Sequence, residues 1–537
     1  MSKSALTHCL LNLKGCKILQ NEENILKIYE VPRKEIMRQQ AKMIAKCQIG
    51  EPNLLNTHEK VIILVGATGT GKSTLINGIT NYILGVNWED HYRFKLIVEE
   101  TNRSQIHSQT SWITAYSFHP MKGSKLPYTL TIIDTPGFGD TRGIDRDKEI
   151  IGQIKEYFSL NPPDGIDQLH AVVFVTQSSH ARLTPTQRYI FDSILAVFGK
   201  DIADNIHVMT TFADGKRPPV LKAVEAAGVP YVATFKVNNS ALYADNTDMF
   251  DEMFWKMGYE SFAKFFTEIQ NAEAISLQLT KEVLKERQRL ETVIKGLQPQ
   301  IQSGLSKIDE IQQERKTLEM RESEILANKE FTYKVNMTKQ KKIELQCGEY
   351  VTNCLTCNFT CHYPCHIPND AEKYRCWAMD SERMDSRCRI CDGKCAWGQH
   401  VNNPYRFELY TEEVERTSGD LKKRYEKALE GKKGVHAIIK CMENELKQTH
   451  HQVVQNIQDA RCILQRLQEI ALKPNPLSEV EYIDLLIESE KSEAKQGFKN
   501  RIQALEKLRD QAVILSKMKA AYSTEEFIES QWDIWRE

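Results

Sequence analysis

Gly66–Ser73 reads GATGTGKS and directly follows the apolar run VIILV at Val61–Val65. This is the G-x-x-x-x-G-K-[ST] phosphate-binding loop, and a helical pattern beginning TLINGI follows it, as the motif requires. Its glycines let backbone N–H groups face an anionic phosphate, and the N-terminus of the next helix adds positive potential. Lys72 is expected to act catalytically on the β- and γ-phosphates, and Ser73 to ligate Mg²⁺. The loop residues expected to contact nucleotide are Gly66, Thr68, Gly69, Thr70, Gly71, Lys72, Ser73 and Thr74.

Length and composition set the broad class of the protein. A chain of 537 residues is too long for a single core, so several domains are expected. Its 71 Lys and Arg against 72 Asp and Glu leave a net charge of −1, which predicts no nucleic-acid partner. No apolar stretch approaches the roughly 20 residues of a membrane span. The sequence therefore predicts a soluble, cytoplasmic protein, with peripheral membrane contact left open.

Apolar strands alternate with helical patterns from Val61 to about Phe266. The strands are VIILV, TLTIID (Thr129–Asp134), AVVFV (Ala171–Val175), IHVMT (Ile206–Thr210) and YVATFKV (Tyr231–Val237). Continuous apolar runs of this length, separated by helices, predict an α/β domain with a mainly parallel sheet. Before this region, RKEIMRQQAKMIAKC (residues 33–47) is interpreted as helical.

The pattern changes after about residue 270, where Lys, Glu and Gln dominate. A first heptad seam comprises Leu290, Ile294, Leu297, Ile301, Ile308, Ile311, Leu318 and Ile325. A second comprises Leu421, Tyr425, Ala428, Val435, Ile439, Met442, Leu446 and Val453, and continues after a slip through Ile457, Ala460, Leu464 and Leu467. Two such seams flanking a cysteine cluster favour a long antiparallel coiled-coil hairpin; surface helices on a globular core are the alternative.

Asp134-Thr135-Pro136-Gly137 ends the strand TLTIID. A carboxylate at this strand end can hold Mg²⁺ beside Ser73, and the Gly137 N–H can contact a γ-phosphate, so Gly137 is a candidate catalytic residue. Between the loop and this strand lies QIHSQTSWITAY, from which Thr110 is chosen as the catalytic and Mg²⁺-binding hydroxyl. Ser108 and Ser111 are its rivals. The expected Mg²⁺ ligands are Ser73, Thr110 and Asp134.

The segment TTFADG provides the candidate base-reading residues. Thr211 and Asp214 follow a strand, and the Asp214 carboxylate can accept hydrogen bonds from guanine N1–H and N2–H₂, which adenine does not offer. Phe212 stands where the [NT]-K-x-D motif has Lys, which weakens the sequence case for GTP over ATP. Ser240, in KVNNSALY, is a further candidate base contact.

Two segments of this region resemble known protein families. IIDTPGFGDT (Ile132–Thr141) resembles the switch region of septins. ARLTPTQRYIFDSILAVFGKDI (Ala181–Ile202) followed by MTTFAD is similar to AIG1-type GTPases. The resemblance covers roughly residues 60–245 and implies a Ras-like guanine-nucleotide domain, Mg²⁺ dependence and dimerisation across the nucleotide face. The whole chain resembles septin/AIG1-like proteins with a C-terminal coiled coil.

Hydrolysis is expected to be slow. Phe138 occupies the position where Ras-type enzymes carry a water-orienting Gln, and no other base is identifiable. Arg103 and Arg142 are candidate charge-stabilising residues, with solvated surface arginines as the alternative.

Eight of the 14 Cys lie between Cys354 and Cys395. Their C-x-x-C spacing in a chain interpreted as intracellular predicts structural Zn²⁺ sites rather than disulfides. The candidate ligands are Cys354, Cys357, Cys361, Cys365, Cys376, Cys388, Cys391, Cys395, His362 and His400, and His366 lies among them. They suffice for two sites, but the spacing does not pair them. The first group is too dense for a RING-like module.

The expected domains are 1–58 N-terminal extension, 59–268 P-loop domain, 269–346 coiled-coil helix, 347–405 zinc-binding module, 406–473 returning helix and 474–537 C-terminal helical segment. The predicted function is a GTP-binding switch that controls self-association, as a homodimer or higher oligomer, or capture of an unknown protein partner. GTP or GDP, Mg²⁺ and Zn²⁺ are the expected cofactors. Two alternatives remain: an ATPase whose coiled coil acts as a bridging or mechanical arm, and a scaffold that nucleotide only stabilises.

Overall fold

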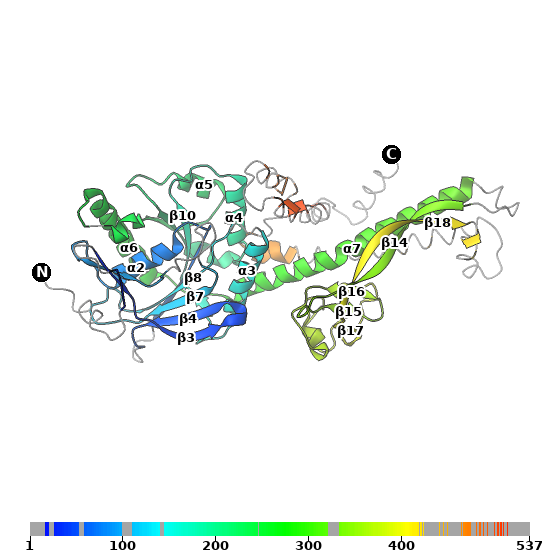
Figure 1. Ribbon diagram of the computed structural model, residues 1–537, viewed down its shortest axis with the longest axis horizontal. Coiled ribbons are helices and arrows are strands. Elements are labelled where there is room, and N and C mark those ends of the chain that lie inside the picture. Colours follow the sequence, from blue (N-terminus) through cyan, green and yellow to red (C-terminus); the bar gives the residue numbers. More distant parts are fainter. Residues whose placement is uncertain are drawn as a thin grey trace. The chain divides into compact units, whose positions relative to one another are not determined.

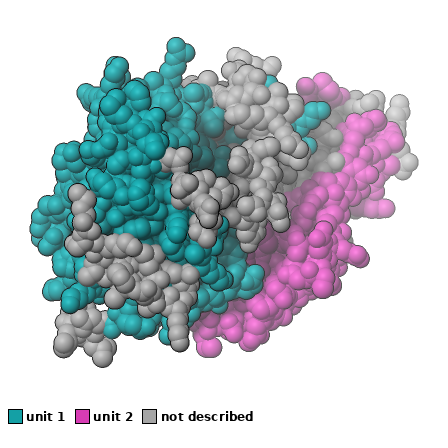
Figure 2. All heavy atoms as spheres, turned by 60° about the vertical axis from the view of Figure 1, so that its left-hand side comes forward, with its two compact units in different colours: residues 1–284, 468–512 teal, residues 285–467, 513–537 magenta. Residues whose placement is uncertain are grey.

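The computed structural model describes residues 17–20, 26–52, 58–98, 110–139, 144–244, 246–320 and 332–417, and scattered residues from 419 to 513. The described chain forms two compact units, 1–284 with 468–512 and 285–467 with 513–537 (Figure 2).

The first unit is built on an eight-stranded sheet of order β12-β11-β10-β5-β8-β7-β4-β3. In chain order these strands are β3 Lys34–Gln39, β4 Ile44–Ile49, β5 Glu59–Gly66, β7 Ile113–Phe118, β8 Thr129–Asp134, β10 Ala171–Gln177, β11 Ile206–Thr211 and β12 Ala233–Lys236. The five strands from β12 to β8 are parallel, β7 is antiparallel to β8, β4 is parallel to β7, and β3 is antiparallel to β4. The predicted mainly parallel α/β sheet is therefore present.

Side chains alternate between the two faces of this sheet, and each face has its own core. Ile63 pairs with Ile133 on one side and Val172 on the other, and these three belong to one core cluster. Ile62 and Leu64 point to the opposite cluster. The first cluster is covered by α3 (Ile144–Ser159), α4 (Pro185–Leu195) and α5 (Val220–Ala226); the second is covered by α2 (Lys72–Ile83) and α6 (Met249–Asn271) (Figure 1). Because β5 is central, its C-terminal end lies where parallel α/β sheets place ligands.

Short strands extend the first unit. β1 (Ile18–Gln20), β2 (Lys27–Glu30) and β6 (Tyr92–Lys95) form a three-stranded sheet, and β9 (Gln168–Leu169) pairs with β13 (Ile275–Ser276). Two 3-10 segments, η2 (Lys200–Asn205) and η3 (Asn239–Tyr243), follow α4 and β12.

The interpretation of residues 33–47 as helical is wrong, since they contribute β3 and β4 instead. Ile44, Cys47 and Ile49 are buried while Lys46 and Gln48 are half-buried, which is an approximate strand periodicity in IAKCQI. The charged and Gln-containing composition of β3 imitates a helix, but pairing with β4 overrides that propensity.

The second unit contains most of α7 (Gln278–Met320), a two-stranded ribbon and a Cys-rich module (Figure 1). The ribbon pairs β14 (Thr332–Glu344) with β18 (Tyr405–Thr417) in antiparallel register, from Thr332↔Thr417 to Glu344↔Tyr405. The module lies between these strands in sequence, and its sheet has the order β16 (Phe359–His362), β15 (Thr352–Cys354), β17 (His400–Val401).

The predicted coiled-coil hairpin with a metal tip needs correction here. The helix ends before residue 332, and residues 332–344 and 406–417, predicted as helix, belong to strands. Val335 faces Val414 across the ribbon, and oppositely charged side chains also pair, as Lys334 does with Glu413. The buried α7 residues Glu310 and Glu314 contact Arg416 of β18, so this part of the helix packs on a strand. The second seam lies outside the described residues, Leu467 excepted.

Candidate functional site

The loop between β5 and α2 has the backbone conformation of a phosphate cradle. Gly69 and Gly71 have φ of 79° and 81°, in the left-handed region that favours glycine. Gly71 is the N-cap of α2, which begins at Lys72. A Cβ on Gly66 would lie 2.3 Å from the carbonyl oxygen of Val175 on the neighbouring strand. The loop N–H groups and the helix N-terminus therefore form an anion-binding concavity at the end of the central strand.

Lys72 is buried under this loop, with 7% exposure. Its Nζ donates hydrogen bonds to the carbonyl oxygens of Gly66 at 3.1 Å and Ala67 at 3.0 Å. Burial lowers the pKa of Lys72 to about 8, and the nearby Asp134 carboxylate opposes that shift. The ammonium group is thus held at the loop by two uncharged carbonyl oxygens. An anionic phosphate would accept a stronger hydrogen bond from it than either carbonyl does.

Ser73, Thr110 and Asp134 line one cavity of about 450 Å³. The Ser73 and Thr110 hydroxyl oxygens are 3.1 Å apart. Asp134 is 2% exposed, and its Oδ1 has no hydrogen-bond partner among the described residues. Burial raises the pKa of Asp134 to about 7, with Lys72 as the opposing influence. Two hydroxyls and a buried carboxylate oxygen without a partner are a donor set that fits Mg²⁺.

The rival hydroxyls are placed differently. Ser108 lies outside the described residues. Ser111 lines the same cavity, and its carbonyl oxygen accepts hydrogen bonds from Arg146 Nη2 at 3.3 Å and Gln153 Nε2 at 3.4 Å, both on α3. These contacts fix the backbone next to Thr110.

The loop after β8 is attached to the phosphate-binding loop. The Thr68 N–H donates to the Phe138 carbonyl oxygen at 2.8 Å, and the Phe138 N–H donates to Gly66 at 3.1 Å. A Cβ on Gly137 would lie 2.6 Å from the Thr68 Cα, so only glycine allows this approach. The Phe138 ring is fully buried in the core of the first unit. The side chain at this position therefore cannot orient a water molecule in the site. The two candidate charge-stabilising residues, Arg103 and Arg142, lie outside the described residues.

The candidate base-reading residues lie beside this loop. The Thr211 hydroxyl donates to the Thr70 carbonyl oxygen at 2.8 Å, so it supports the phosphate-binding loop. Phe212 has a φ of 51°, is 56% exposed, and its ring lies 3.7 Å from the position of a Cβ on Gly71. Asp214 is exposed and its Oδ1 accepts a hydrogen bond from the Lys216 N–H at 3.1 Å.

Ser240 lies in η3, after β12, where it is exposed and its N–H donates to Oδ1 of Asn238, the residue before this segment, at 3.2 Å. A backbone hydrogen bond from Ala213 to Val237, at 3.1 Å, joins the segment after β12 to the loop that carries Asp214. The two segments thus form one edge of the site.

Sequence reasoning missed two contributions. Gln177, the last residue of β10, donates from Nε2 to the Gly69 carbonyl oxygen at 2.8 Å. Arg33, Arg38 and Cys47, on and just before the β3–β4 hairpin, line the cavity that contains Asp134. Gln177 could have been noticed as a polar residue ending an apolar strand. No sequence signal marks the hairpin residues, because only strand pairing brings them to the site.

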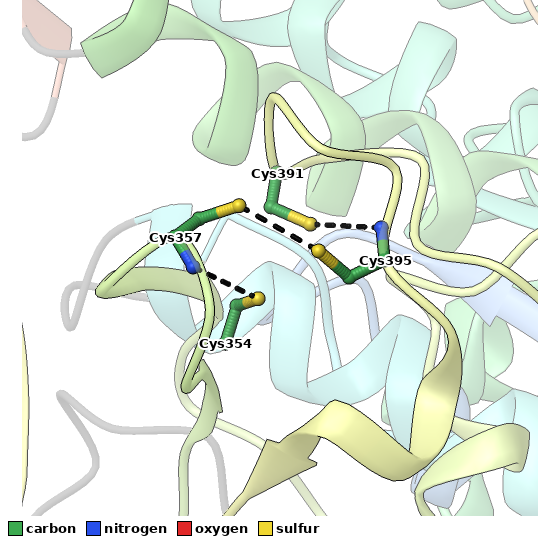
Figure 3. Close-up of side chains that lie close together, drawn as sticks. All are labelled: Cys354, Cys357, Cys391 and Cys395. Carbon is green, nitrogen blue, oxygen red and sulfur yellow. Dashed lines mark hydrogen bonds between the residues drawn. The ribbon is translucent and has the colours of Figure 1, made fainter.

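The Cys-rich module gathers the predicted zinc ligands into three groups. These are Cys354, Cys357, Cys391 and Cys395 (Figure 3); Cys361, Cys388, Cys391 and His400; and His362, Cys365 and Cys376. Within each group the ligand atoms lie within 4.8 Å of one another. The Cys357 and Cys395 sulfurs are 3.7 Å apart and the Cys365 and Cys376 sulfurs 3.9 Å apart, too far for disulfides. Every ligand candidate in the predicted set belongs to a group, whereas His366 belongs to none.

Part of the first unit is similar to a known protein family. Residues 60–220 match the AIG1 family. The predicted AIG1 resemblance is thereby confirmed for this segment, while the septin resemblance stays a prediction. The AIG1 segment runs from β5 to the start of α5 and includes the phosphate-binding loop, Asp134 and Asp214.

Solved structures similar to the chain include Toc33 from Arabidopsis thaliana. Its complex with GDP and Mg²⁺ is 15% identical, and the match covers 41% of this chain and 88% of that chain with a TM-score of 0.26. A second solved structure, named for the chloroplast translocon components atToc33 and psToc159, is 17% identical. That match covers 38% of this chain and 83% of the other chain, with a TM-score of 0.26. Scores of this size do not establish a shared fold. No curated protein matches the chain. Among the described residues, no helix is long and apolar enough to cross a membrane.

Proposed function

We propose that this protein is a guanine-nucleotide-binding switch that hydrolyses GTP slowly. The main observation behind the proposal is that Ser73, Thr110 and the buried Asp134 carboxylate line one cavity beside the loop that holds Lys72. Nucleotide triphosphates present a chain of phosphates with Mg²⁺ at one edge, and this arrangement is complementary to both. The AIG1 match of residues 60–220 supports the same class.

Each residue has a separate task in this proposal. Backbone N–H groups of the loop and Lys72 would bind the β- and γ-phosphates, while Ser73, Thr110 and Asp134 would hold Mg²⁺. When bound, Mg²⁺ would neutralise phosphate charge. Gly137 packs so closely on Thr68 of the phosphate-binding loop that a Cβ there would lie 2.6 Å from the Thr68 Cα, so loss of a γ-phosphate would change the contacts of the loop after β8.

Guanine rather than adenine is proposed because of Asp214. The exposed carboxylate lies beyond Phe212, whose ring lies next to the phosphate-binding loop at Gly71. A carboxylate accepts from the guanine N1–H and N2–H₂, whereas adenine presents an unprotonated N1 there. Phe212 would cover one face of the base.

Slow turnover is proposed because Phe138 is fully buried in the core. A hydrolysing water must be positioned for in-line attack, and the side chain in the usual water-orienting position points away from the site.

The nucleotide would then act as a timer that controls self-association, as a homodimer or larger assembly, with zinc stabilising the Cys-rich module. Light scattering with GDP and with a non-hydrolysable GTP analogue would test assembly; equal masses would contradict it.

The decisive experiment measures binding of labelled GTP and ATP to the full chain, with and without Mg²⁺. We expect GTP to bind more tightly than ATP and Mg²⁺ to strengthen binding. Lys72→Ala should weaken GTP binding about 10- to 100-fold, because a charge-assisted contact contributes about 1.5–3 kcal/mol. Lys222→Ala, on the exposed side of α5, is the matched control.

Asp214→Asn should remove the preference for GTP, with exposed Asp204→Asn as its control. Equal affinity of the wild type for ATP would favour the ATPase alternative. Tight GTP binding without phosphate release above background would leave a nucleotide-stabilised scaffold.

A further inference from the structure

We infer that the Cys-rich module binds three zinc ions, two of which share the thiolate of Cys391. The inference rests on the proposed zinc content of this module and is independent of nucleotide binding. It assigns every ligand to an ion, which the Cys spacing alone leaves open.

The number of ligands carries the argument. Two tetrahedral zinc ions need eight coordination positions. The first two groups contain only seven different side chains, because Cys391 belongs to both. A thiolate has enough lone pairs to bind two ions at once, so counting Cys391 twice closes both sites. Without sharing, one of the two ions would have three protein ligands.

The surroundings of Cys391 fit a shared position. Six of the seven side chains are buried and Cys357 is half-buried. The Cys391 sulfur lies 3.7 Å from His400 Nε2 of the second group and 3.4 Å from the Cys395 backbone N–H of the first. In Figure 3 the Cys391 side chain lies across from Cys354 and Cys357, next to Cys395. It therefore faces ligands of both groups.

Distances and orientation agree with zinc coordination. With Zn–S bonds of about 2.3 Å, two sulfurs on one tetrahedral ion are about 3.8 Å apart. The Cys357–Cys395 separation of 3.7 Å matches this value. His400 Nδ1 lies 3.0 Å from the Ala396 carbonyl oxygen, and donating to it leaves the Nε2 lone pair for the metal. The Cys388 sulfur accepts from the backbone N–H groups of Ile390 at 3.3 Å and Cys391 at 3.5 Å, as a thiolate ligand would.

The third ion has a separate ligand set. Cys365 and Cys376 have sulfurs 3.9 Å apart, and His362 Nδ1 is 3.2 Å from the Cys376 sulfur. The Thr352 hydroxyl lies 3.3 Å from both sulfurs, and the buried Lys373 ammonium is 3.7 Å from Cys365. Three protein ligands leave one coordination position for a water or another small donor.

Metal counting on the full chain tests this assignment through paired variants. The wild type should carry three zinc ions per chain by elemental analysis against protein concentration. Cys391→Ala should lose two ions, whereas Cys357→Ala and Cys376→Ala should each lose one. Cys347→Ala, an exposed cysteine outside the three groups, should lose none. Loss of a single ion from Cys391→Ala would overturn the shared thiolate.

A measurement on the wild type avoids variants that fail to fold. After substitution with ¹¹³Cd, three cadmium resonances are expected, and two should be split by mutual coupling through the shared sulfur. Three uncoupled resonances would overturn the sharing while leaving zinc binding intact. Absence of bound metal would refute the zinc proposal itself, and GTP binding by the same sample would show that the nucleotide proposal stands separately.

Discussion

At the scale of single residues, the phosphate-binding loop combines local and long-range requirements. Gly69 and Gly71 are needed for their positive φ, which the chain demands locally. Gly66 and Gly137 are needed because other segments approach them, Val175 in one case and Thr68 in the other. The motif therefore specifies Gly66 and Gly71 and leaves Gly69 at a variable position, while the contacts made by Gly66 and Gly137 are known only from the folded protein.

Gly137→Ala tests the close approach to Thr68. The added Cβ would lie 2.6 Å from the Thr68 Cα and 2.7 Å from its nitrogen, so the backbone must shift. We expect a loss of about 1–3 kcal/mol in the free energy of unfolding and weaker nucleotide binding. Gly152→Ala, on an exposed turn of α3 where a Cβ meets nothing within 4 Å, should be neutral or stabilising. Thermal unfolding of both variants is the measurement, and equal melting temperatures would contradict the prediction.

His170 predicts a pH dependence of stability. It is buried, and its Nδ1 accepts a hydrogen bond from the Val61 N–H at 3.1 Å, which requires the neutral ring. Burial, with Lys60 nearby, lowers the pKa of His170 from 6.5 to about 4. The unfolded chain thus binds the proton more readily, and the stabilisation is complete above about pH 6.5 and lost as the pH falls towards 4.

Thermal unfolding between pH 7.5 and 4.5 measures this effect. His170→Asn keeps an acceptor near the Nδ1 position without a titrating group, so its melting temperature should fall less steeply with pH than that of the wild type. Parallel curves for the two proteins would show that His170 does not contribute.

At the scale of elements, the second unit shows how composition misleads. The β14 and β18 segments are rich in Lys and Glu, as surface helices are, yet their charges pair across the ribbon: Lys339 with Glu412 at 2.8 Å and Lys341 with Glu408 at 2.8 Å. On α7, Glu310 and Glu314 are buried against the ribbon. At Glu310 and Glu314, therefore, a charged residue does not indicate a solvent-exposed face of the helix.

Arg416→Met tests this packing. Arg416 contacts Glu310 at 3.1 Å and the fully buried Glu314 at 2.7 Å, so the substitution removes a positive charge from beside two buried carboxylates. We expect a cost of about 3–5 kcal/mol to the second unit. Lys334→Met removes only an exposed pair with Glu413 and should cost at most about 1 kcal/mol. Hydrogen exchange of β14 and β18 amides would report the difference; similar protection in both variants would argue against the packing.

At the scale of the whole molecule, the chain returns to its first unit after the second. Residues 468–512 belong to the first unit, and Ile483, Ile487 and Leu505 are buried in the same core cluster as Ile63. An ion pair of 3.1 Å between Lys473 and Asp192 of α4 accompanies this return. The predicted C-terminal helical segment is thus in large part a component of the first unit.

Ile483→Ala tests that dependence at a distance in sequence from the site. Ile483 is fully buried, so its truncation should cost about 2–5 kcal/mol and lower the melting temperature of the first unit. Lys491→Ala, exposed in the same segment, is the control. If Ile483→Ala and Lys491→Ala unfold at the same temperature as the wild type, the segment does not stabilise this core.

Much of the first unit could be predicted from sequence. The apolar runs that form β5, β8, β10 and β11 are continuous because both faces of a central strand are buried, and this pattern is visible without a structure. Asp134 could also be predicted as a site residue, because it is the last residue of the apolar run that forms β8. The β3–β4 hairpin was missed because neither strand has such a run: the edge strand β3 is mostly exposed, and β4 mixes buried apolar with half-buried polar residues.

By itself, the sequence determined the phosphate-binding loop, the central parallel strands, the AIG1 resemblance and the set of metal-binding candidates. These depend on local backbone conformation and side-chain periodicity, which neighbouring residues specify. The tertiary structure alone decided that Thr110 meets Ser73, that Phe138 points into the core, how the cysteines group around Cys391, and that residues 468–512 complete the first unit. Those arrangements depend on pairing between segments far apart in the chain, and residue spacing does not encode which segments meet.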